Sequence, residues 1–150
     1  MTDPFNLTRF VKAQERTYKA ALRELRGGRK HGHWMWFIFP QFEGLGASAN
    51  SRWYAIRSLG EAMAYLDHPV LGPRLHECAE TFMLIPGPSA EDILGSLDAM
   101  KLKSSMTLFE IVAPPNSAFA RVLDEYFRGE RDEMTVRAVK RAAGTSGRSS

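Results

Sequence analysis

Residues 33–41 read HWMWFIFPQ, and six consecutive apolar side chains fill positions 34–39. A run with no polar face must be buried, so this segment decides where the core of the protein lies. A buried strand, a short buried helix and an extended segment through the core are all compatible with such a run, and hydrophobic periodicity does not choose among them. His33 and Gln41, which flank the run, are polar groups that need partners.

The segment before this run is predicted to be an amphipathic helix from Asn6 to Arg26, ended by Gly27 and Gly28. Gln14 interrupts its apolar face, where an unpaired amide costs about 1 to 3 kcal/mol. This amide either lines a pocket or bonds internally. Cations recur at three-and-four spacing along one flank and form a basic stripe: Arg9, Lys12, Arg16, Lys19, Arg23 and Arg26.

Residues 44–51, which begin with Gly44 and Gly46, are predicted to be a loop that can approach a ligand closely. Beyond the loop, helix signals alternate with breakers. Six further helices are predicted. The first is capped by Ser58 and reaches about Leu66, the second begins at about Leu71 and is ended by Pro86-Gly87-Pro88, and the third runs from Ser89 to about Gly95. The fourth runs from about Asp98 to Val112, the fifth carries Phe119 and ends at Gly129, and the sixth runs from about Asp132 to Ala142.

The fold class expected from these elements is all-α. It is a compact multihelical single domain of six or seven mostly short helices with an irregular buried aromatic segment. The length of 150 residues suits one domain, and 44% hydrophobic with 25% charged residues is ordinary globular composition. We expect residues 1–141 to form the domain and residues 142–150 to form a disordered basic tail.

The positive charge of the chain is unevenly placed. Residues 137–150 hold four cations and no acid, so the formal net charge of +3 leaves 3 − 4 = −1 for residues 1–136. Overall basicity is therefore a weak sign of nucleic-acid binding. No apolar run reaches the length of a membrane span, and the first residues lack the layout of a signal peptide. We expect a cytoplasmic protein whose single cysteine, Cys78, is an inert core thiol.

The motif GRK at residues 28–30, followed by HWMWFIFPQ, resembles a mainly bacterial family catalogued as a domain of unknown function. The likeness continues through residues 44–46, 68–75 and the motif KLKSSMTLF at 101–109, and it spans about residues 3–140. The resemblance implies an all-helical fold and no established activity. Some members carry a calpastatin label, which nothing in this globular sequence supports. Gly32 and Lys103 depart from the family, whose members often have Ser or Thr and Arg at these positions.

Two clusters of polar and aromatic residues could bind a ligand. Residues 29–41 combine cations, imidazoles, indoles and an amide, which suit phosphate and the faces of bases or sugars. Residues 101–107 add ammonium and hydroxyl groups suited to an anion. The simpler interpretation is that the aromatic residues are core and that residues 101–107 form a solvated helix turn. The candidate catalytic residue is His33, and the candidate binding residues are Lys30, Trp34, Trp36, Gln41, Ser51, Tyr54, Lys103, Ser104, Ser105 and Gln14.

His31 and His33 would share a face if the segment were a strand, which permits metal ligation. A third ligand is missing nearby in the sequence, so we expect no metal and no cofactor.

Three functions remain open. The first is binding or conversion of a phosphorylated small molecule, such as a nucleotide or an ADP-ribose-like compound. The second is nucleic-acid binding through the stripe from Arg9 to Arg26 and the basic tail. The third is a non-catalytic protein-interaction module, which predicts an exposed apolar groove instead of a polar pocket. The first requires His33, Gln41 and Ser104 to lie in one pocket.

Overall fold

A computed structural model describes residues 3–85 and 89–148, with side chains described through residue 143. Within these ranges the chain forms nine helices and one isolated parallel β-bridge, between Phe42 and Ile56. The helices are α1 (Thr8–Arg26), α2 (Met35–Ile38), α3 (Ala49–Trp53), α4 (Leu59–Asp67), α5 (Leu71–Met83), α6 (Ala90–Leu94), α7 (Ser96–Val112), α8 (Ala118–Tyr126) and α9 (Glu133–Arg148). The predicted all-α class is confirmed.

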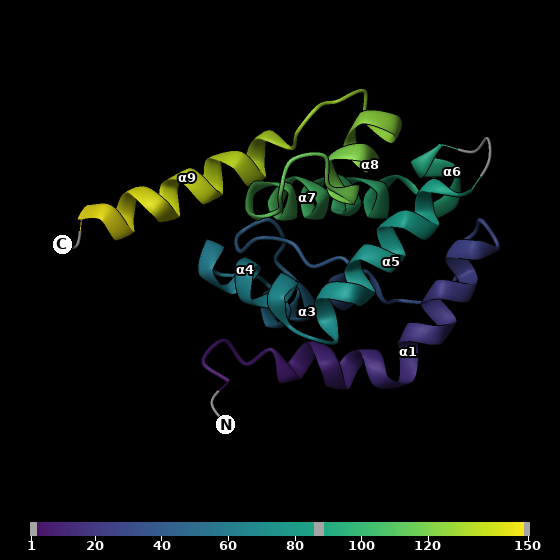
Figure 1. Cartoon of the computed structure of the whole chain (residues 1–150), viewed down its shortest axis with the longest axis horizontal. Helices are drawn as coiled ribbons and strands as arrows, with labels where there is room; N and C mark the ends of the chain where they lie inside the picture. Colours follow the sequence, from purple (N-terminus) through teal and green to yellow (C-terminus); the bar gives the residue numbers. More distant parts are fainter. Residues whose placement is uncertain (1–2, 86–88, 149–150) are drawn as a thin grey trace.

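The arrangement of the helices is layered. Helix α1 lies along one side of the molecule, α7 and α8 lie along the opposite side, and α4 and α5 pass between them (Figure 1). Helix α9 packs against α7 and extends outward from the body. Helix α7 contacts α8, α6, α4, α9 and α2, so much of the fold is built around it.

Helix α1 ends at Arg26, as predicted, and begins at Thr8, two residues after the predicted start. The Asp3 carboxylate accepts the backbone N–H groups of Leu7 and Thr8, at 2.8 and 3.0 Å, and so satisfies donors that a helix start leaves free. The bond from Thr8 is the main reason that the pKa of Asp3 lies below its ordinary value. Gly28 follows the helix with φ +76°, a conformation that favours glycine.

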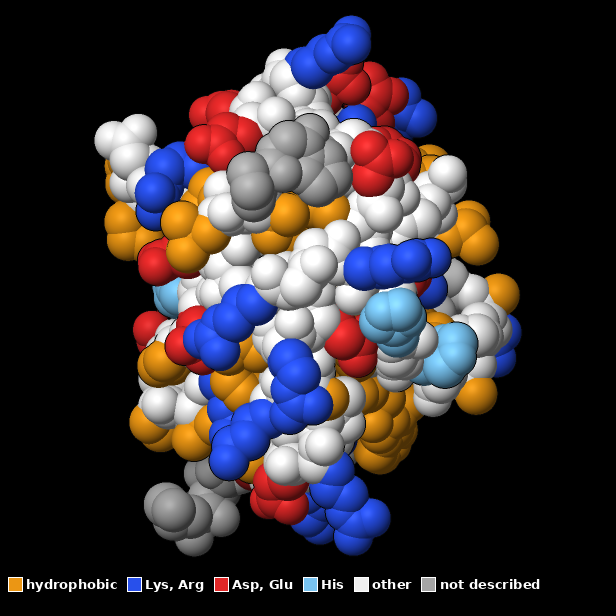
Figure 2. All heavy atoms as spheres, turned by 90° about the vertical axis from the view of Figure 1, so that its right-hand side faces the viewer, with side chains coloured by type: hydrophobic (Ala, Val, Ile, Leu, Met, Phe, Trp, Pro, Cys, Tyr) orange, Lys and Arg blue, Asp and Glu red, His pale blue; other side chains and the backbone are white. Residues whose placement is uncertain are grey.

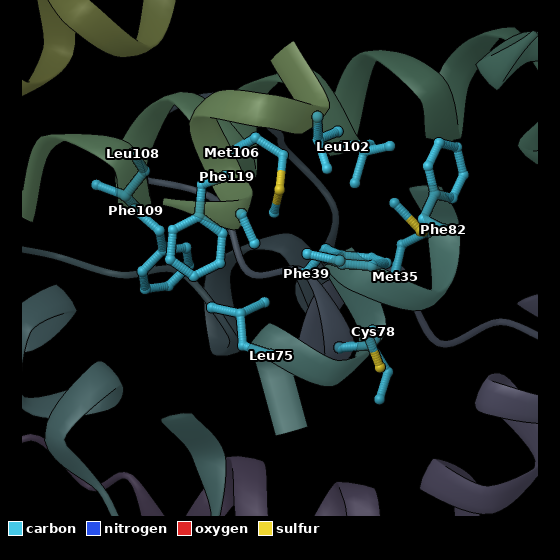
Figure 3. Close-up of a cluster of buried hydrophobic side chains, with 14 of the residues drawn as sticks. Met35, Phe39, Leu75, Cys78, Phe82, Leu102, Met106, Leu108, Phe109 and Phe119 are labelled. Carbon is cyan, nitrogen blue, oxygen red and sulfur yellow. The ribbon is translucent and has the colours of Figure 1, made fainter. Parts of the chain in front are cut away.

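The aromatic run forms a single helical turn, α2, which is the short buried helix among the three possibilities. Met35, Ile38 and Phe39 are fully buried, and Figure 3 shows Met35 and Phe39 facing side chains of α7 and α8. The run therefore sits at the centre of the core. This position fixes the residues on either side of it, including Gln41.

Some elements differ from the sequence-based expectation. Helix α3 begins inside the predicted loop and runs two residues past it, and the Ser48 hydroxyl caps it by accepting the N–H of Ser51 at 3.1 Å. Helix α7 begins at Ser96, slightly before the predicted start. Helix α9 passes Ala142, and the side chains of its last turns lie outside the described part. The disordered tail stays a prediction, and the Pro86-Gly87-Pro88 terminator lies outside the described residues.

Candidate functional site

Polar side chains from separate elements meet in one cleft of about 370 Å³, which we call the α7 cleft. Gln41 follows α2, Ser51 lies on α3, and Lys101 and Ser104 lie on α7. Asp132, just before α9, adds a carboxylate. The remaining lining residues are Leu45, Gly46, Leu97, Met100 and Met134. Three of the residues predicted to bind a ligand, Gln41, Ser51 and Ser104, are therefore brought together.

The wall formed by residues 41–51 is held by backbone contacts. The Gln41 carbonyl accepts the Ile56 N–H at 2.9 Å, and the Glu43 N–H donates to the Ile56 carbonyl at 2.9 Å. The Ser51 hydroxyl bonds the Ser48 hydroxyl at 2.9 Å. A Cβ at Gly46 would lie 2.5 Å from Ser51 Oγ, so only glycine lets the loop pass this close to Ser51.

A directional chain of hydrogen bonds forms the buried end of the α7 cleft. Thr135 Oγ1 donates to Asp132 Oδ2 at 2.6 Å, and Thr135 Oγ1 lies 2.8 Å from Ser104 Oγ. A hydroxyl has a single proton, and Thr135 gives its proton to the carboxylate. Ser104 must therefore donate to Thr135. The Ser104 oxygen keeps its lone pairs, so this end of the cleft presents hydrogen-bond acceptors.

Lys101, which lines the cleft, belongs to a small cluster of charged side chains. Lys30 Nζ lies 2.8 Å from Asp98 Oδ2, and Lys101 Nζ lies 3.3 Å from Asp98 Oδ1. Two ammonium groups share one carboxylate, so this cluster has a net charge of 2 − 1 = +1. Lys101 also lies over the Trp36 ring, 4.7 Å from its centroid, and Lys30 lies 5.2 Å from the centroid of Trp34. Of these residues, only Lys101 lines the cleft.

His33 and the aromatic residues predicted to bind a ligand do not line the α7 cleft. His33 is exposed and is absent from the lining residues. Trp34 is fully buried, and its indole donates to Glu24 at 3.1 Å. Trp36 is half-buried, and its indole nitrogen has no hydrogen-bond partner among the described residues. The Tyr54 ring packs 5.4 Å from the ring of Phe37.

The other predicted binding residues take different places. Lys103 pairs with Glu130 at 3.4 Å, outside the α7 cleft. Ser105 is fully buried, and its hydroxyl has no hydrogen-bond partner in the described part of the chain. Gln14 is also buried, and its amide nitrogen donates to the Phe37 carbonyl at 2.7 Å. The Gln14 amide thus takes the internal bonding arrangement of the two considered for it.

Glu24 fixes the loop that carries the histidines. Its Oε1 accepts the backbone N–H groups of His31 and Gly32, at 2.5 and 2.8 Å, in addition to the Trp34 indole. Burial disfavours the charged carboxylate, but these donors outweigh it, so the pKa of Glu24 lies below its ordinary value. A Cβ on Gly32 would lie 2.9 Å from the Trp34 ring, which explains why glycine fits here.

Several residues of the site were missed by the sequence reasoning. Asp98 lies three positions before Lys101, a helical ion-pair spacing that could have suggested the pair. Asp132 has N-cap spacing to Thr135, whose N–H it accepts at 3.0 Å. Leu97 and Met100 are large apolar residues that remain exposed beside the cleft. The sequence offered no signal for their position, because they lie within an apolar-rich helix.

Other candidate features can be placed as well. Arg9 does not belong to the surface stripe, because its guanidinium is buried against Glu61. Among the described residues, no group of three His, Cys, Asp or Glu side chains is arranged to hold a metal ion. None of the described helices combines the length and apolar character of a membrane span.

Comparisons with known proteins identify the family. The chain belongs to the DUF1810 family, described as a protein of unknown function, whose model matches residues 4–139. It is similar to the crystal structure of the conserved hypothetical protein Rv1873 from Mycobacterium tuberculosis, with 50% sequence identity and a TM-score of 0.90. That likeness covers 92% of this chain and 99% of the other. Among curated proteins, no match to the chain is found.

Proposed function

We propose that the α7 cleft binds a small phosphorylated molecule that also carries hydroxyl groups, such as a nucleotide or an ADP-ribose-like compound. The observation that carries the proposal is the meeting of Gln41, Ser51, Lys101 and Ser104 in one cleft. These residues are far apart in the sequence, and the fold brings their side chains into one cleft. Its volume of about 370 Å³ is within the range of small-molecule sites.

The polarity of the cleft suggests how such a ligand would lie. The Ser104 oxygen and the Asp132 carboxylate accept hydrogen bonds, so they suit sugar hydroxyl groups. Lys101, with the excess positive charge of its cluster, suits a phosphate. Met100 and Leu45 offer apolar surface for a base or a sugar face. A ribose phosphate has all three features.

The proposed function is binding, and no reaction is assigned to it. The sequence-based version of this function required His33 to share a pocket with Gln41 and Ser104, but His33 lies outside the lining of the α7 cleft. The catalytic role of His33 is therefore dropped, and only binding at Gln41 and Ser104 is kept. A cytoplasmic location belongs to the proposal, because nucleotides and sugar phosphates are abundant there and the compartment keeps Cys78 reduced.

Thermal unfolding with added ligand tests the proposal. We expect AMP, ribose 5-phosphate or ADP-ribose at millimolar concentration to raise the unfolding temperature, while ribose or phosphate alone raises it less. A ligand at 100 times its Kd stabilises the folded state by about 2.7 kcal/mol, which such a scan detects. The absence of any stabilisation by all three phosphorylated compounds would reject the proposal.

Two lysines of α7 provide a matched pair of variants. Lys101→Met removes the cation that lines the cleft, whereas Lys103→Met removes one that pairs with Glu130 elsewhere. We expect Lys101→Met to weaken AMP binding by tenfold or more and Lys103→Met to leave it unchanged. Equal weakening by both variants would show that the cleft is not the binding site.

The mouth of the α7 cleft also bears on the protein-interaction alternative. Leu97, Met100 and Met134 are 77%, 66% and 62% exposed, and all three line the cleft. Clustered apolar side chains of this kind also occur where proteins dock. If the small-molecule proposal is right, Met100→Ser weakens AMP binding. The matching change Met63→Ser on α4, at another exposed methionine that is absent from the cleft lining, does not weaken it. Insensitivity of binding to Met100→Ser would favour a protein partner for these residues.

A further inference from the structure

The outer face of α1 carries a row of cations that the α7 cleft does not use. Its members, which we call the α1 basic face, are Lys12, Arg16, Lys19, Arg23 and Arg26, and all five are exposed. At 100° and 1.5 Å per residue they fall within an arc of about 80° and extend over about 21 Å. Phe10, Gln14, Ala21 and Leu25, which are buried, lie on the opposite side. The row therefore points to solvent along its whole length.

The α1 basic face is not neutralised by the fold. None of its five side chains makes an ion pair or a side-chain hydrogen bond with another residue in the described part of the chain. Seven cations elsewhere in the described part of the chain do pair with carboxylates: Arg9, Lys30, Arg57, Lys101, Lys103, Arg131 and Arg137. The acidic residues of α1 are Glu15, at the edge of the arc, and Glu24, which is bonded to the 31–34 loop. Figure 2 shows Lys and Arg side chains gathered on the side of the molecule where α1 ends.

An exposed tryptophan lies near the start of α1, where Trp53 and Arg9 line the same surface hollow. Trp53, the last residue of α3, is 53% exposed. Arg9 joins α1 to it, because Arg9 Nε donates to the Trp53 carbonyl at 2.7 Å and Nη2 donates to the Ala55 carbonyl at 2.9 Å. Arg9 precedes Lys12 by one helical turn. An indole held at the surface, rather than packed in the core, is available to stack on a planar group.

We propose that the α1 basic face and Trp53 together bind single-stranded nucleic acid. A row of unpaired cations follows a phosphate backbone, and an exposed aromatic ring stacks on an unpaired base. An anionic membrane fits less well, because the apolar face of α1 is buried in the core and cannot insert into lipid. Paired bases fit less well too, because the faces of stacked bases are not free to meet Trp53. The proposal is independent of the α7 cleft, since the two sites share no residue.

Binding of a fluorescent 15-nucleotide oligo(U) to the full chain, followed by anisotropy at 50 mM salt, tests the proposal. We expect binding that weakens with salt, with a slope of log K against log salt of about −3.5 if all five cations are engaged. We expect Trp53→Ala to weaken it about tenfold, the order of one base stacked on an aromatic ring. The same oligonucleotide in a duplex should bind more weakly and without dependence on Trp53.

Charge reversal at matched sites separates the α1 basic face from general attraction. Arg16→Glu/Lys19→Glu and the control Arg121→Glu/Arg128→Glu change the net charge equally, and all four side chains are exposed. We expect the first variant to weaken oligo(U) binding at least tenfold more than the control, with unchanged circular dichroism and unchanged AMP binding. The proposal is overturned by absence of binding at 50 mM salt, by equal effects of the two variants, by insensitivity to Trp53→Ala, or by binding only to vesicles of anionic lipid.

Discussion

Arg9 and Glu61 form a buried ion pair between α1 and α4, with Arg9 Nη2 2.8 Å from Glu61 Oε2 and only 7% and 4% of the two side chains exposed. Both groups are further satisfied, because Glu61 accepts the Arg57 N–H at 2.9 Å and Arg9 donates to the carbonyls of Phe5, Trp53 and Ala55. The pair therefore ties the start of α1 to the segment between α3 and α4.

Breaking this pair should be costly. Removing one partner leaves the other as an uncompensated buried charge, which costs about 3 to 5 kcal/mol. We predict a loss of this size in the free energy of unfolding for Arg9→Met or Glu61→Gln, measured by urea denaturation. The double variant should lose less than the sum of the two single losses. Additive losses would mean that the two side chains do not interact.

Glu24 should make the stability of the 31–34 loop depend on pH. Its pKa is lower in the folded chain than in the unfolded chain, so its contribution is present above the unfolded value and is lost as the pH falls through the folded value. We predict that Glu24→Gln lowers the free energy of unfolding by about 1 to 3 kcal/mol at pH 7. The difference from the parent protein should shrink below about pH 4. A difference that stays constant down to pH 3 would contradict this role.

The elements that follow from sequence are those with local signals. Periodicity identifies α1, and the capping pair Ser89 and Asp92 identifies α6, whose reciprocal capping bonds are present. The apolar run from Trp34 to Phe39 carries no periodicity, so its burial could be predicted but its helical turn could not. Helix α3 is made of small and polar residues typical of loops, so composition did not reveal it.

The residues of the candidate site could be predicted only in part, because local sequence patterns do not show which distant segments meet. Gln41 and Ser104 meet in the α7 cleft as expected, but Lys101 and Lys103 point about 200° apart on a helix, so the two cannot share one face. Helical geometry alone could have made that distinction. The exposure of His33 and the burial of Arg9 depend on contacts with distant segments, which a local pattern does not contain.

Cys78 should be unreactive in the folded protein. The thiol is buried, and burial raises the pKa of Cys78 to about 12, so very little reactive thiolate is present at neutral pH. We predict that a thiol reagent such as an aromatic disulfide labels Cys78 only at the rate at which the chain opens, and rapidly in denaturant. Fast, complete labelling of the native protein at pH 7 would contradict the burial.

Gly46 and Gly60 test the packing of the α7 cleft, because substitution by alanine should affect stability and AMP binding differently at the two positions. At Gly46 a Cβ would lie 2.5 Å from Ser51 Oγ and 2.8 Å from its Cβ, so Gly46→Ala must displace Ser51 from the wall of the α7 cleft. At Gly60, inside α4, a Cβ would meet its nearest neighbours at ordinary distances of 3.6 and 3.7 Å.

We predict that Gly60→Ala raises the free energy of unfolding by up to about 1 kcal/mol, because alanine restricts the unfolded chain and favours the helix. Gly46→Ala should not stabilise the protein and should weaken AMP binding at least fivefold, whereas Gly60→Ala leaves AMP binding intact. Calorimetric titration of both variants measures the binding. Undiminished affinity in Gly46→Ala would mean that Ser51 does not contact the ligand, even if AMP binds elsewhere in the cleft.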